Sequence, residues 1–464
     1  MYAHDTIAAI ATPPGHGGVA IIRISGPHAE TIARQAFIFS HPRETLQSHH
    51  FYLGHILDPV TGYSIDQALL VAMRSPRSYT GEDVVEIHCH GGQLLSQRVL
   101  EVILSRGARM AEPGEFTKRA FLNNRLDLSQ AEAVLDLIHA KSNQGLHLAW
   151  EQLSGRLSDV CMTLRERLVG LTAYIEAFID FPDEDLPERA QHELDAEMNV
   201  LATDIAALAS TFTQGKIYRE GCRTVIVGKP NVGKSSLLNL LSGTERAIVT
   251  PVPGTTRDIL EETVVLNGIP LVIWDTAGLR ETSDTVERVG VERAKAGIHA
   301  AELVLAVFDA SEPLDAEDEG VFSAIQQKRT IPILNKVDLP VVVSLEDLQP
   351  RLNMMPPVLL STKTGVGFDE LGERVRQALF TQESTLKEQE PPQGATVIRV
   401  RHHDALIKAE QTLRQARQNV HDGIPLDLIA VDLRTALDHI GEITGHVNTE
   451  DILDRVFRDF CIGK

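Results

Sequence analysis

The sequence predicts a multidomain α/β protein in which a doubly wound, mostly parallel sheet is inserted into an α-helical domain and follows an N-terminal α/β domain. The chain has 464 residues, which corresponds to about three domains at ~150 residues each. Strand-like and helical runs alternate between about 222 and 380. Amphipathic helical stretches lie on both sides of that segment, and neither set makes a bundle alone. We therefore expect domains or domain halves at 1–122, 123–217, 218–382 and 383–464.

The composition is that of an acidic globular protein. Lys and Arg total 44 against 64 Asp and Glu, which gives a net charge of −20, and hydrophobic residues make up 43%. These values exclude a mostly disordered chain, a collagen and a coiled-coil rod. A protein that wraps nucleic acid with its whole surface carries the opposite charge balance. Any RNA or DNA is therefore expected to bind a local basic patch or a partner's surface.

The cysteines and the apolar runs bear on the cellular compartment. The four cysteines have no C-x-x-C spacing and are too few for a disulfide framework. The first residues lack the basic region of a signal peptide, and no run of ~18 apolar residues predicts a membrane span. We expect a reduced, soluble, cytoplasmic protein that does not bind a membrane.

The N-terminal part has the patterns of mixed α/β structure. Apolar or alternating runs predict strands over 18–24 and 83–88, with proline and glycine turns between them. Helical spacing predicts a helix over 93–106, with the apolar positions Leu94, Val99, Val102 and Ile103. The His-Cys-His run at 88–90 is not expected to bind a metal ion, because adjacent strand residues point to opposite faces.

The flanking regions are expected to be helical. Ser129 and Glu132 form a capping-box pattern that starts a helix over 131–140, and a helix over 190–214 should end at Gly215. Between them, one continuous helix should present an apolar stripe at Leu146, Trp150, Leu153, Leu157, Val160, Leu164, Leu168, Leu171, Ile175 and Phe178. After a charged linker at 383–394, the last helix should have one apolar face, made of Ile452, Leu453, Val456, Phe457 and Phe460.

A glycine-rich phosphate-binding pattern, G-x-x-x-x-G-K-S, occupies 228–235. A strand-like run at 224–227 precedes it and a helical run from Ser236 follows, which is the required order. Backbone N–H groups of such a loop hold phosphate oxygens at the positive end of the helix. Lys234 is expected to bridge the outer phosphates, and the Ser235 hydroxyl to bind Mg²⁺.

Three later motifs specify the nucleotide. Thr256, in a loop at 254–258, is expected to complete the Mg²⁺ shell, and Asp275 to hold Mg²⁺ through water while Gly278 approaches the γ-phosphate. In the Asn-Lys-Val-Asp run, the Asp338 carboxylate can accept hydrogen bonds from the guanine ring N–H and exocyclic amine, which selects GTP over ATP. The inserted domain is therefore predicted to be a P-loop GTPase domain. Its expected nucleotide contacts are Asn231, Val232, Gly233, Lys234, Ser235, Ser236, Thr250, Pro251, Val252, Pro253, Gly254, Thr255, Thr256, Asp275, Thr276, Ala277, Gly278, Asn335, Lys336, Asp338, Ser361, Thr362 and Lys363.

One position departs from the common pattern of such GTPases. Many Ras-type enzymes place a glutamine after the Asp-x-x-Gly motif to orient the attacking water, and Leu279 stands there instead. Hydrolysis must then use another water-positioning group and another source of positive charge. Asn231 is a candidate cation ligand and Glu287 a candidate base, although from spacing alone Glu287 also fits a solvated helix carboxylate.

Over essentially its whole length, the sequence resembles the family of tRNA-modification GTPases called MnmE or TrmE. Besides the GTPase motifs, the resemblance rests on the runs at 5–8, 11–15, 17–19, 23–26, 79–83, 90–92, 113–116, 180–182 and the C-I-G-K run at 461–464. It implies a homodimer built through N-terminal domains that bind a formylated tetrahydrofolate such as 5-formyltetrahydrofolate. It also implies a complex, a heterotetramer or larger, with the flavin- and NADH-dependent partner MnmG (GidA). Together the two proteins would modify the 5-position of the wobble uridine in certain tRNAs, using glycine or ammonium.

The resemblance also implies residue roles. The folate-contacting positions would be Arg23, Glu86, Arg125 and Lys464, with Arg125 replacing the lysine that is usual in the family. Two GTPase domains would pair around GTP, with K⁺ supplying the positive charge and held by Asn231, Thr250, Val252 and Thr255. Glu287 would orient the attacking water indirectly. Cys461 could be a reactive thiol or merely an exposed one.

Two other functions fit parts of the sequence. A K⁺-stimulated GTPase of ribosome assembly would explain the nucleotide motifs but neither the N-terminal third nor the C-I-G-K run. A non-enzymatic scaffold that binds GTP to change partners would need no turnover. A ribosome-assembly GTPase should not bind 5-formyltetrahydrofolate, so a folate-binding measurement tests the first alternative. A scaffold should not hydrolyse GTP, so a turnover measurement tests the second.

Overall fold

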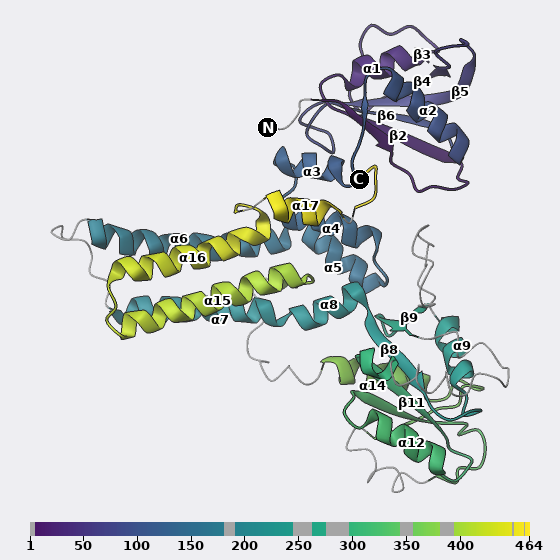
Figure 1. The fold of residues 1–464 in the computed structure, drawn as a ribbon, viewed down its shortest axis with the longest axis vertical. Coiled ribbons are helices and arrows are strands. Elements are labelled where there is room, and N and C mark those ends of the chain that lie inside the picture. Colours follow the sequence, from purple (N-terminus) through teal and green to yellow (C-terminus); the bar gives the residue numbers. More distant parts are fainter. Residues whose placement is uncertain are drawn as a thin grey trace. The chain divides into compact units, whose positions relative to one another are not determined.

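The computed structural model describes residues 5–180, 191–244, 262–274, 297–343, 356–380, 394–447, 450–458 and 460–464 (Figure 1). The chain divides into two compact units. One comprises residues 1–135, 153–161 and 440–464, and the other 136–152 and 162–439. Among the described helices, none combines the length and the apolar character that a membrane crossing requires.

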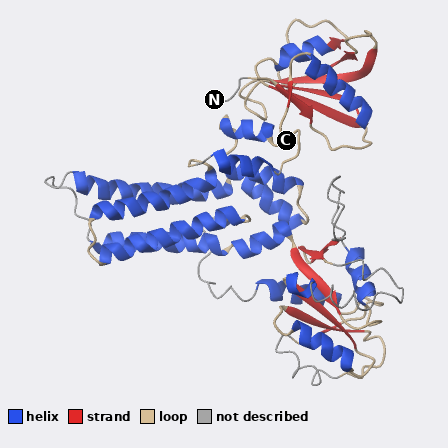
Figure 2. Ribbon diagram, viewed as in Figure 1, coloured by secondary structure: helices blue, strands red, loops and turns tan. Residues whose placement is uncertain are grey.

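The first unit contains a seven-stranded sheet with two helices against one face (Figure 2). The strand order is β3-β4-β5-β6-β2-β1-β7, and every pairing is antiparallel except that of β1 with β7. The strands are β1 Ile7–Ile10, β2 Val19–Ser25, β3 Phe37–Phe39, β4 Phe51–Leu57, β5 Ser64–Met73, β6 Val84–His90 and β7 Arg109–Met110. Helices α1 (Ala29–Ala36) and α2 (Gln93–Ser105) bury the apolar side chains of one sheet face, such as Ile22 and Ile87.

The predicted elements of this sheet are largely confirmed. The strands predicted at 18–24 and 83–88 are β2 and β6, and the predicted helix is α2. Val99, Val102 and Ile103 are buried, but Leu94 is 76% exposed. Leu94 lies in the first turn of α2 on the solvent side, whereas Leu95 of the same turn packs against the core, so the assignment of Leu94 to the apolar face was wrong.

Helix α3 (Glu115–Leu122) leads into α4 (Leu128–Ile138), whose start differs from the prediction. Asp127, not Ser129, caps α4: its Oδ1 accepts from the Gln130 backbone N–H at 2.8 Å, and the Gln130 side chain accepts from the Asp127 N–H at 2.9 Å. Ser129 is buried and donates to Asp127. A reciprocal cap therefore does exist, two residues before the predicted one.

The long helix expected from Leu146 to Phe178 is two helices, α5 (Asn143–Leu153) and α6 (Arg156–Asp180). Gly155 lies between them with φ +98°, a backbone conformation that a helix cannot contain. The apolar stripe is buried along α6 from Leu157 to Ile175, whereas Leu146 and Trp150 on α5 are 45% and 59% exposed. The prediction of one continuous buried stripe was wrong because periodicity alone does not detect a single glycine break.

The next two helices are α7 (Gln191–Ser210) and α8 (Phe212–Glu220). The sequence predicted that a helix ends at Gly215. This prediction was wrong, because Gly215 lies within α8. A Cβ at Gly215 would lie 2.1 Å from the Val397 carbonyl oxygen, so this glycine permits close packing of two backbones. The helix ends instead at Gly221, which has φ +85° and donates its N–H to the Ile217 carbonyl.

The predicted doubly wound sheet has six strands in the order β13-β12-β11-β8-β10-β9. All pairings are parallel except that of β9 with β10. Its elements are β8 Cys222–Val227, α9 Lys234–Thr244, β9 Glu262–Leu266, β10 Ile269–Ile273, β11 Leu303–Asp309, α12 Ala316–Ile325, β12 Thr330–Asn335, β13 Val358–Leu359 and α14 Phe368–Phe380. Strands β10, β11 and β12 are almost entirely buried, as a sheet covered on both faces requires.

The chain then returns to helices α15 (Val400–His421), α16 (Leu426–Thr444) and α17 (Glu450–Arg458). The apolar face predicted for the last helix is confirmed for Leu453 and Phe457, which pack in one cluster with Leu128 and Ala131 of α4. Phe460 joins the same cluster but lies beyond the helix, which ends at Arg458. The fold class is therefore as predicted, and the exact domain boundaries stay predictions.

Candidate functional site

The phosphate-binding loop lies between β8 and α9, at the carboxyl end of a central strand (Figure 1). Gly228, Asn231 and Gly233 all have positive φ, which lets the loop turn tightly. A Cβ at Gly228 would lie 2.3 Å from the Val307 carbonyl oxygen, and one at Gly233 would lie 2.2 Å from the Asn335 amide nitrogen. Both glycines are therefore required by packing as well as by backbone conformation.

Lys234 is folded back over this loop. Its ammonium donates to the carbonyl oxygens of Gly228 at 2.9 Å and Lys229 at 2.7 Å. Burial lowers the pKa of Lys234. Asn231, Ser235 and Ser236 are exposed, whereas the Val232 side chain belongs to the core, so only its backbone is available to a ligand.

The motifs predicted to read guanine meet the phosphate loop through Asn335. Its side-chain amide donates to the Val232 carbonyl at 2.8 Å, and its oxygen accepts from the Thr362 N–H at 3.1 Å. The Asp338 carboxylate accepts from the Ser361 hydroxyl at 2.8 Å. The structure therefore brings together the predicted loop at 228–236, the run at 335–338 and the run at 361–363.

The other predicted nucleotide and cation positions lie outside the described residues. These are Thr250, Pro251, Val252, Pro253, Gly254, Thr255, Thr256, Asp275, Thr276, Ala277 and Gly278, together with Leu279 and Glu287. Their roles stay predictions.

A second candidate site lies on the face of the N-terminal sheet opposite α1 and α2. Arg23 on β2 and Glu86 on β6 are directly paired, and Arg23 Nε donates to Glu86 Oε1 at 2.8 Å. The other carboxylate oxygen lies 3.2 Å from His88 Nε2. Both members of the Arg23–Glu86 pair are mostly buried, with side chains 15% and 14% exposed.

Two aromatic rings enclose the Arg23 guanidinium. Its central carbon lies 5.1 Å from the Tyr79 ring centre and 5.6 Å from that of Phe116. Tyr79 is fixed through its hydroxyl, 2.8 Å from the Thr117 hydroxyl. Within the described part of the chain, Arg23 Nη1 is buried and has no hydrogen-bond partner. This nitrogen is a desolvated donor that a ligand acceptor could satisfy.

The C-I-G-K run lies beside this pair. The Phe116 N–H donates to the Lys464 carbonyl at 3.2 Å, and Gly114 N–H donates to the Cys461 carbonyl at 3.4 Å. Burial, followed by the positive charge of Arg23, lowers the pKa of Lys464, and Glu86 and Cys461 oppose that shift. Three of the four predicted folate positions, Arg23, Glu86 and Lys464, therefore lie within electrostatic range of one another. Cys461 is an exposed free thiol.

Arg125, the fourth predicted position, is hydrogen-bonded to the residue before Tyr79. Its Nε donates to the Ser78 carbonyl at 3.2 Å. An ionic network also fixes this region, because Arg119 Nη2 contacts Asp5 at 2.7 Å and Arg119 Nη1 contacts Glu82 at 3.2 Å. Hydrogen bonds from Arg125 to Ser78 and from Arg119 to Glu82 thus hold the segment that carries Tyr79.

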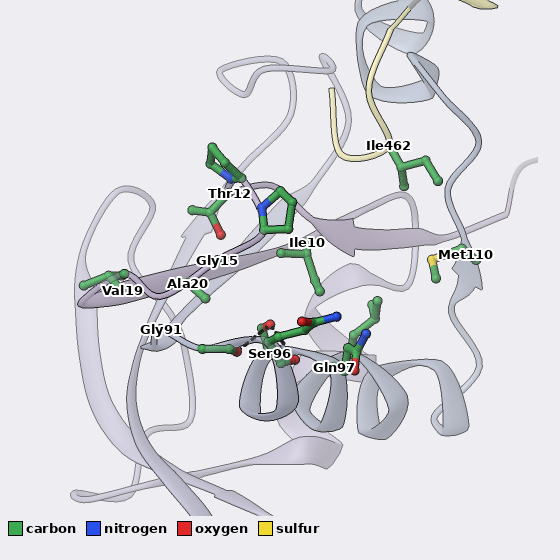
Figure 3. A pocket seen from close by; sticks show the side chains of 16 residues that line it. Ile10, Thr12, Gly15, Val19, Ala20, Gly91, Ser96, Gln97, Met110 and Ile462 are labelled. Carbon is green, nitrogen blue, oxygen red and sulfur yellow. Dashed lines mark hydrogen bonds between the residues drawn. The ribbon is translucent and has the colours of Figure 1, made fainter. Parts of the chain in front are cut away.

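A separate cavity of about 270 Å³ lies beside the amino end of α2 (Figure 3). Its walls are largely apolar and include Ile10, Val19, Leu100, Met110 and Ile462. None of the four predicted folate positions lines it.

Several residues that the structure places at these sites were not predicted from the sequence to have a role there. They are Tyr79, His88 and Phe116 around the Arg23–Glu86 pair, and Asp309 beside Lys336. Of these, Asp309 had a detectable signal, because it is a charged residue at the carboxyl end of a buried parallel strand. The packing of the Tyr79 and Phe116 rings on Arg23 depends on tertiary structure, so no local sequence pattern could have predicted it.

Two family models match the chain. The TrmE N-terminus model, described as that of a GTP-binding protein, matches residues 6–125, and the MnmE helical domain model matches residues 128–461. Together they cover nearly all of the chain, including the inserted domain.

Full-length relatives give the same result. Proteins named tRNA modification GTPase MnmE are 49% identical in Geobacter sulfurreducens, over 100% of both chains, and 45% identical in Natranaerobius thermophilus and Desulforamulus reducens, over 99% of each chain. Among solved structures, the G domain of the T. maritima FeoB iron transporter is 26% identical, with a TM-score of 0.26, and covers 34% of this chain and 98% of that one.

Proposed function

Because the chain belongs to the MnmE family of tRNA modification GTPases, we propose that it couples GTP hydrolysis to wobble-uridine modification with a one-carbon unit from a formylated tetrahydrofolate. The family assignment itself makes the chain a GTP hydrolase of tRNA modification, and it excludes the ribosome-assembly and scaffold alternatives. The folate, the cation, the partner and the exact nucleotide position are the parts that we propose.

The observation that carries the folate proposal is the buried Nη1 of Arg23, which has no hydrogen-bond partner among the residues that the structure describes. A desolvated guanidinium nitrogen without an acceptor costs free energy, so an acceptor on a bound ligand would stabilise it. Beside it, Glu86 can accept hydrogen bonds from the amino and ring N–H donors of a pterin. Lys464 and Arg125 supply positive charge for the carboxylates of a folate. The residues present therefore fit this ligand.

Removal of the Glu86 charge tests this proposal. In Glu86→Gln we expect equilibrium affinity for 5-formyltetrahydrofolate to fall about tenfold to a hundredfold, the effect of losing one charge-assisted hydrogen bond. GTP turnover should not change, because Glu86 lies on the N-terminal sheet and the nucleotide motifs lie on the other sheet. In cells that express only this variant, mass spectrometry of tRNA should show loss of the wobble-uridine modification.

Glu101→Gln is the matched control, because Glu101 is 60% exposed on α2 and pairs only with Arg98 among the described residues. It should bind 5-formyltetrahydrofolate like the unmodified chain. If Glu86→Gln also bound the folate normally, the Arg23–Glu86 pair would not be the folate site.

The homodimer is supported by the same sheet face. Adjacent strand residues form a row across it, Phe51, Val71, Glu86 and Arg23, and a second row contains Leu53, Leu69 and His88. Phe51 is 56% exposed and Leu53 is 48% exposed. Such an exposed apolar patch is typical of a protein interface. We propose that a second copy covers this face, next to the candidate folate site.

In the GTPase domain, we propose that Ser235 and Thr256 hold Mg²⁺ and that Asn231, Thr250, Val252 and Thr255 hold K⁺. Of the described members, Asn231 and Ser235 are exposed at the phosphate loop. The cation would supply positive charge to the transition state, and Glu287 would orient the water in place of a glutamine.

GTP turnover should therefore depend on the monovalent cation. We expect the rate in KCl to exceed that in NaCl at equal ionic strength by about tenfold or more, since in-trans arginine fingers contribute 10³–10⁵-fold at the same position. Light scattering on the same samples should give the mass of a dimer. Equal rates in the two salts would remove K⁺ from the mechanism.

The acidic surface of the chain bears on its partners. With a net charge of −20, the chain offers little general attraction to a phosphate backbone. We propose that the flavoprotein MnmG forms the complex with this dimer and contributes much of the basic surface that holds the tRNA.

A further inference from the structure

We propose that Asp309, at the carboxyl end of β11, is a positioning residue for guanine nucleotide: its carboxylate holds the Lys336 ammonium, and thereby fixes the lysine stem beside the base-reading groups. None of the nucleotide motifs includes Asp309. It follows Phe308 at the end of a buried strand and is 4% exposed. The proposal concerns how the nucleotide site is preorganised, and it holds whether or not a folate binds elsewhere.

The Asp309 carboxylate has a partner on each oxygen. Oδ2 lies 2.5 Å from the Lys336 ammonium nitrogen. Oδ1 accepts from the Ser311 N–H at 2.9 Å and from the Ser311 hydroxyl at 2.7 Å. Burial raises the pKa of Asp309, but the hydrogen bonds from Lys336 and Ser311 outweigh it, so the net pKa is lowered and the group is ionised at neutral pH.

Lys336 is held from its backbone as well. It has φ +66°, a left-handed conformation that costs free energy in a residue with a side chain. Neighbouring hydrogen bonds keep it there: the Leu339 N–H donates to the Lys336 carbonyl at 2.9 Å, and the Ala310 N–H donates to the Asn335 carbonyl at 2.8 Å. The Ala310 bond links the residue after Asp309 directly to the motif strand β12.

This arrangement leaves one part of Lys336 available to a ligand. The ammonium is engaged by Asp309, while the side chain as a whole is 31% exposed. The exposed part is therefore mainly the methylene stem, a narrow apolar surface between Asn335 and Asp338. A planar base whose edge is bound by Asp338 could lie against that stem. Without Asp309, the stem would have to be ordered during binding, which weakens affinity.

The test measures nucleotide affinity and steady-state kinetics on the full chain. Asp309→Asn should weaken equilibrium binding of fluorescent GDP about tenfold and raise the KM for GTP by a similar factor with kcat unchanged. A merely structural role would lower the active fraction, and thus the apparent kcat, without raising KM. Glu373→Gln, which breaks the exposed Glu373–Arg376 pair of the same domain, should change neither.

A double-mutant cycle assigns the effect to Lys336. In a Lys336→Met background, Asp309→Asn should cause no further loss of GDP affinity, because the pair is already broken. An equal loss in both backgrounds, or an unchanged KM in Asp309→Asn, would overturn the proposal. If Asp309→Asn does not fold, Lys336→Met alone breaks the same pair, and an unchanged KM there would also overturn it.

Discussion

Asp338→Asn is expected to weaken GTP binding about 10³-fold, the largest effect on function that we predict for a single substitution. The Asp338 carboxylate can accept two hydrogen bonds from guanine, and each charge-assisted bond contributes about 2 kcal/mol. An asparagine offers one acceptor and one donor in their place. The donor suits the 2-oxo group of xanthine, so xanthosine triphosphate should bind this variant more tightly than GTP does.

The measurement is a competition titration of GTP and xanthosine triphosphate against labelled GDP. Asp369→Asn is the control, because it removes a carboxylate exposed in the first turn of α14 in the same domain. It should leave both affinities unchanged. Unchanged GTP affinity in Asp338→Asn would mean that this carboxylate does not read the base.

Asp136→Ala is expected to lower the free energy of unfolding of the helical part of the second unit by about 3–5 kcal/mol. Asp136 is 7% exposed and accepts from Arg219 Nε at 2.7 Å and from Arg399 Nε and Nη2, both at 2.8 Å. These contacts connect α4, α8 and the residue before α15, which are far apart in the sequence. Removal of the carboxylate leaves two mostly buried guanidinium groups without their shared partner.

Urea unfolding followed by circular dichroism should show this loss as a lower midpoint. Glu176→Ala is the comparison, since Glu176 also joins two helices, α6 and α16, through Arg434, but at the surface, where the two side chains are 34% and 61% exposed. Exposed ion pairs contribute about 0–1 kcal/mol, so its midpoint should move little. Equal shifts in the two variants would contradict the role of burial at Asp136.

The sequence was sufficient for the fold class and for the nucleotide motifs, because both depend on local patterns. A phosphate loop needs glycines at fixed positions, and a doubly wound sheet alternates strand and helix along the chain. The described motif residues do meet: Asn335 bonds to the loop at Val232, and Asp338 to Ser361. The family resemblance, once its motifs were read together, was confirmed by the full-length relatives.

Errors arose where two local readings compete or where packing decides. Asp127 with Gln130 and Ser129 with Glu132 both fit the capping-box pattern, and in the structure it is Asp127 and Gln130 that exchange the two hydrogen bonds. Gly215 looked like a helix stop, yet it is glycine because the Val397 carbonyl approaches within 2.1 Å of where a Cβ would be. Similarly, nothing local indicates that Asp309 reaches Lys336 or that Phe116 lies on Arg23, since those contacts join separate elements.

The passage from α8 into β8 through the single residue Gly221 has a mechanical consequence. Ile217 of α8 packs in the same core as Leu271 and Leu237, and a Cβ at Gly221 would lie 2.7 Å from the Val272 side chain. The connection between α8 and β8 is therefore short and closely packed. A displacement of β8, the strand that precedes the phosphate loop, should therefore move α8 with it, because the two elements are joined by one residue and share one core.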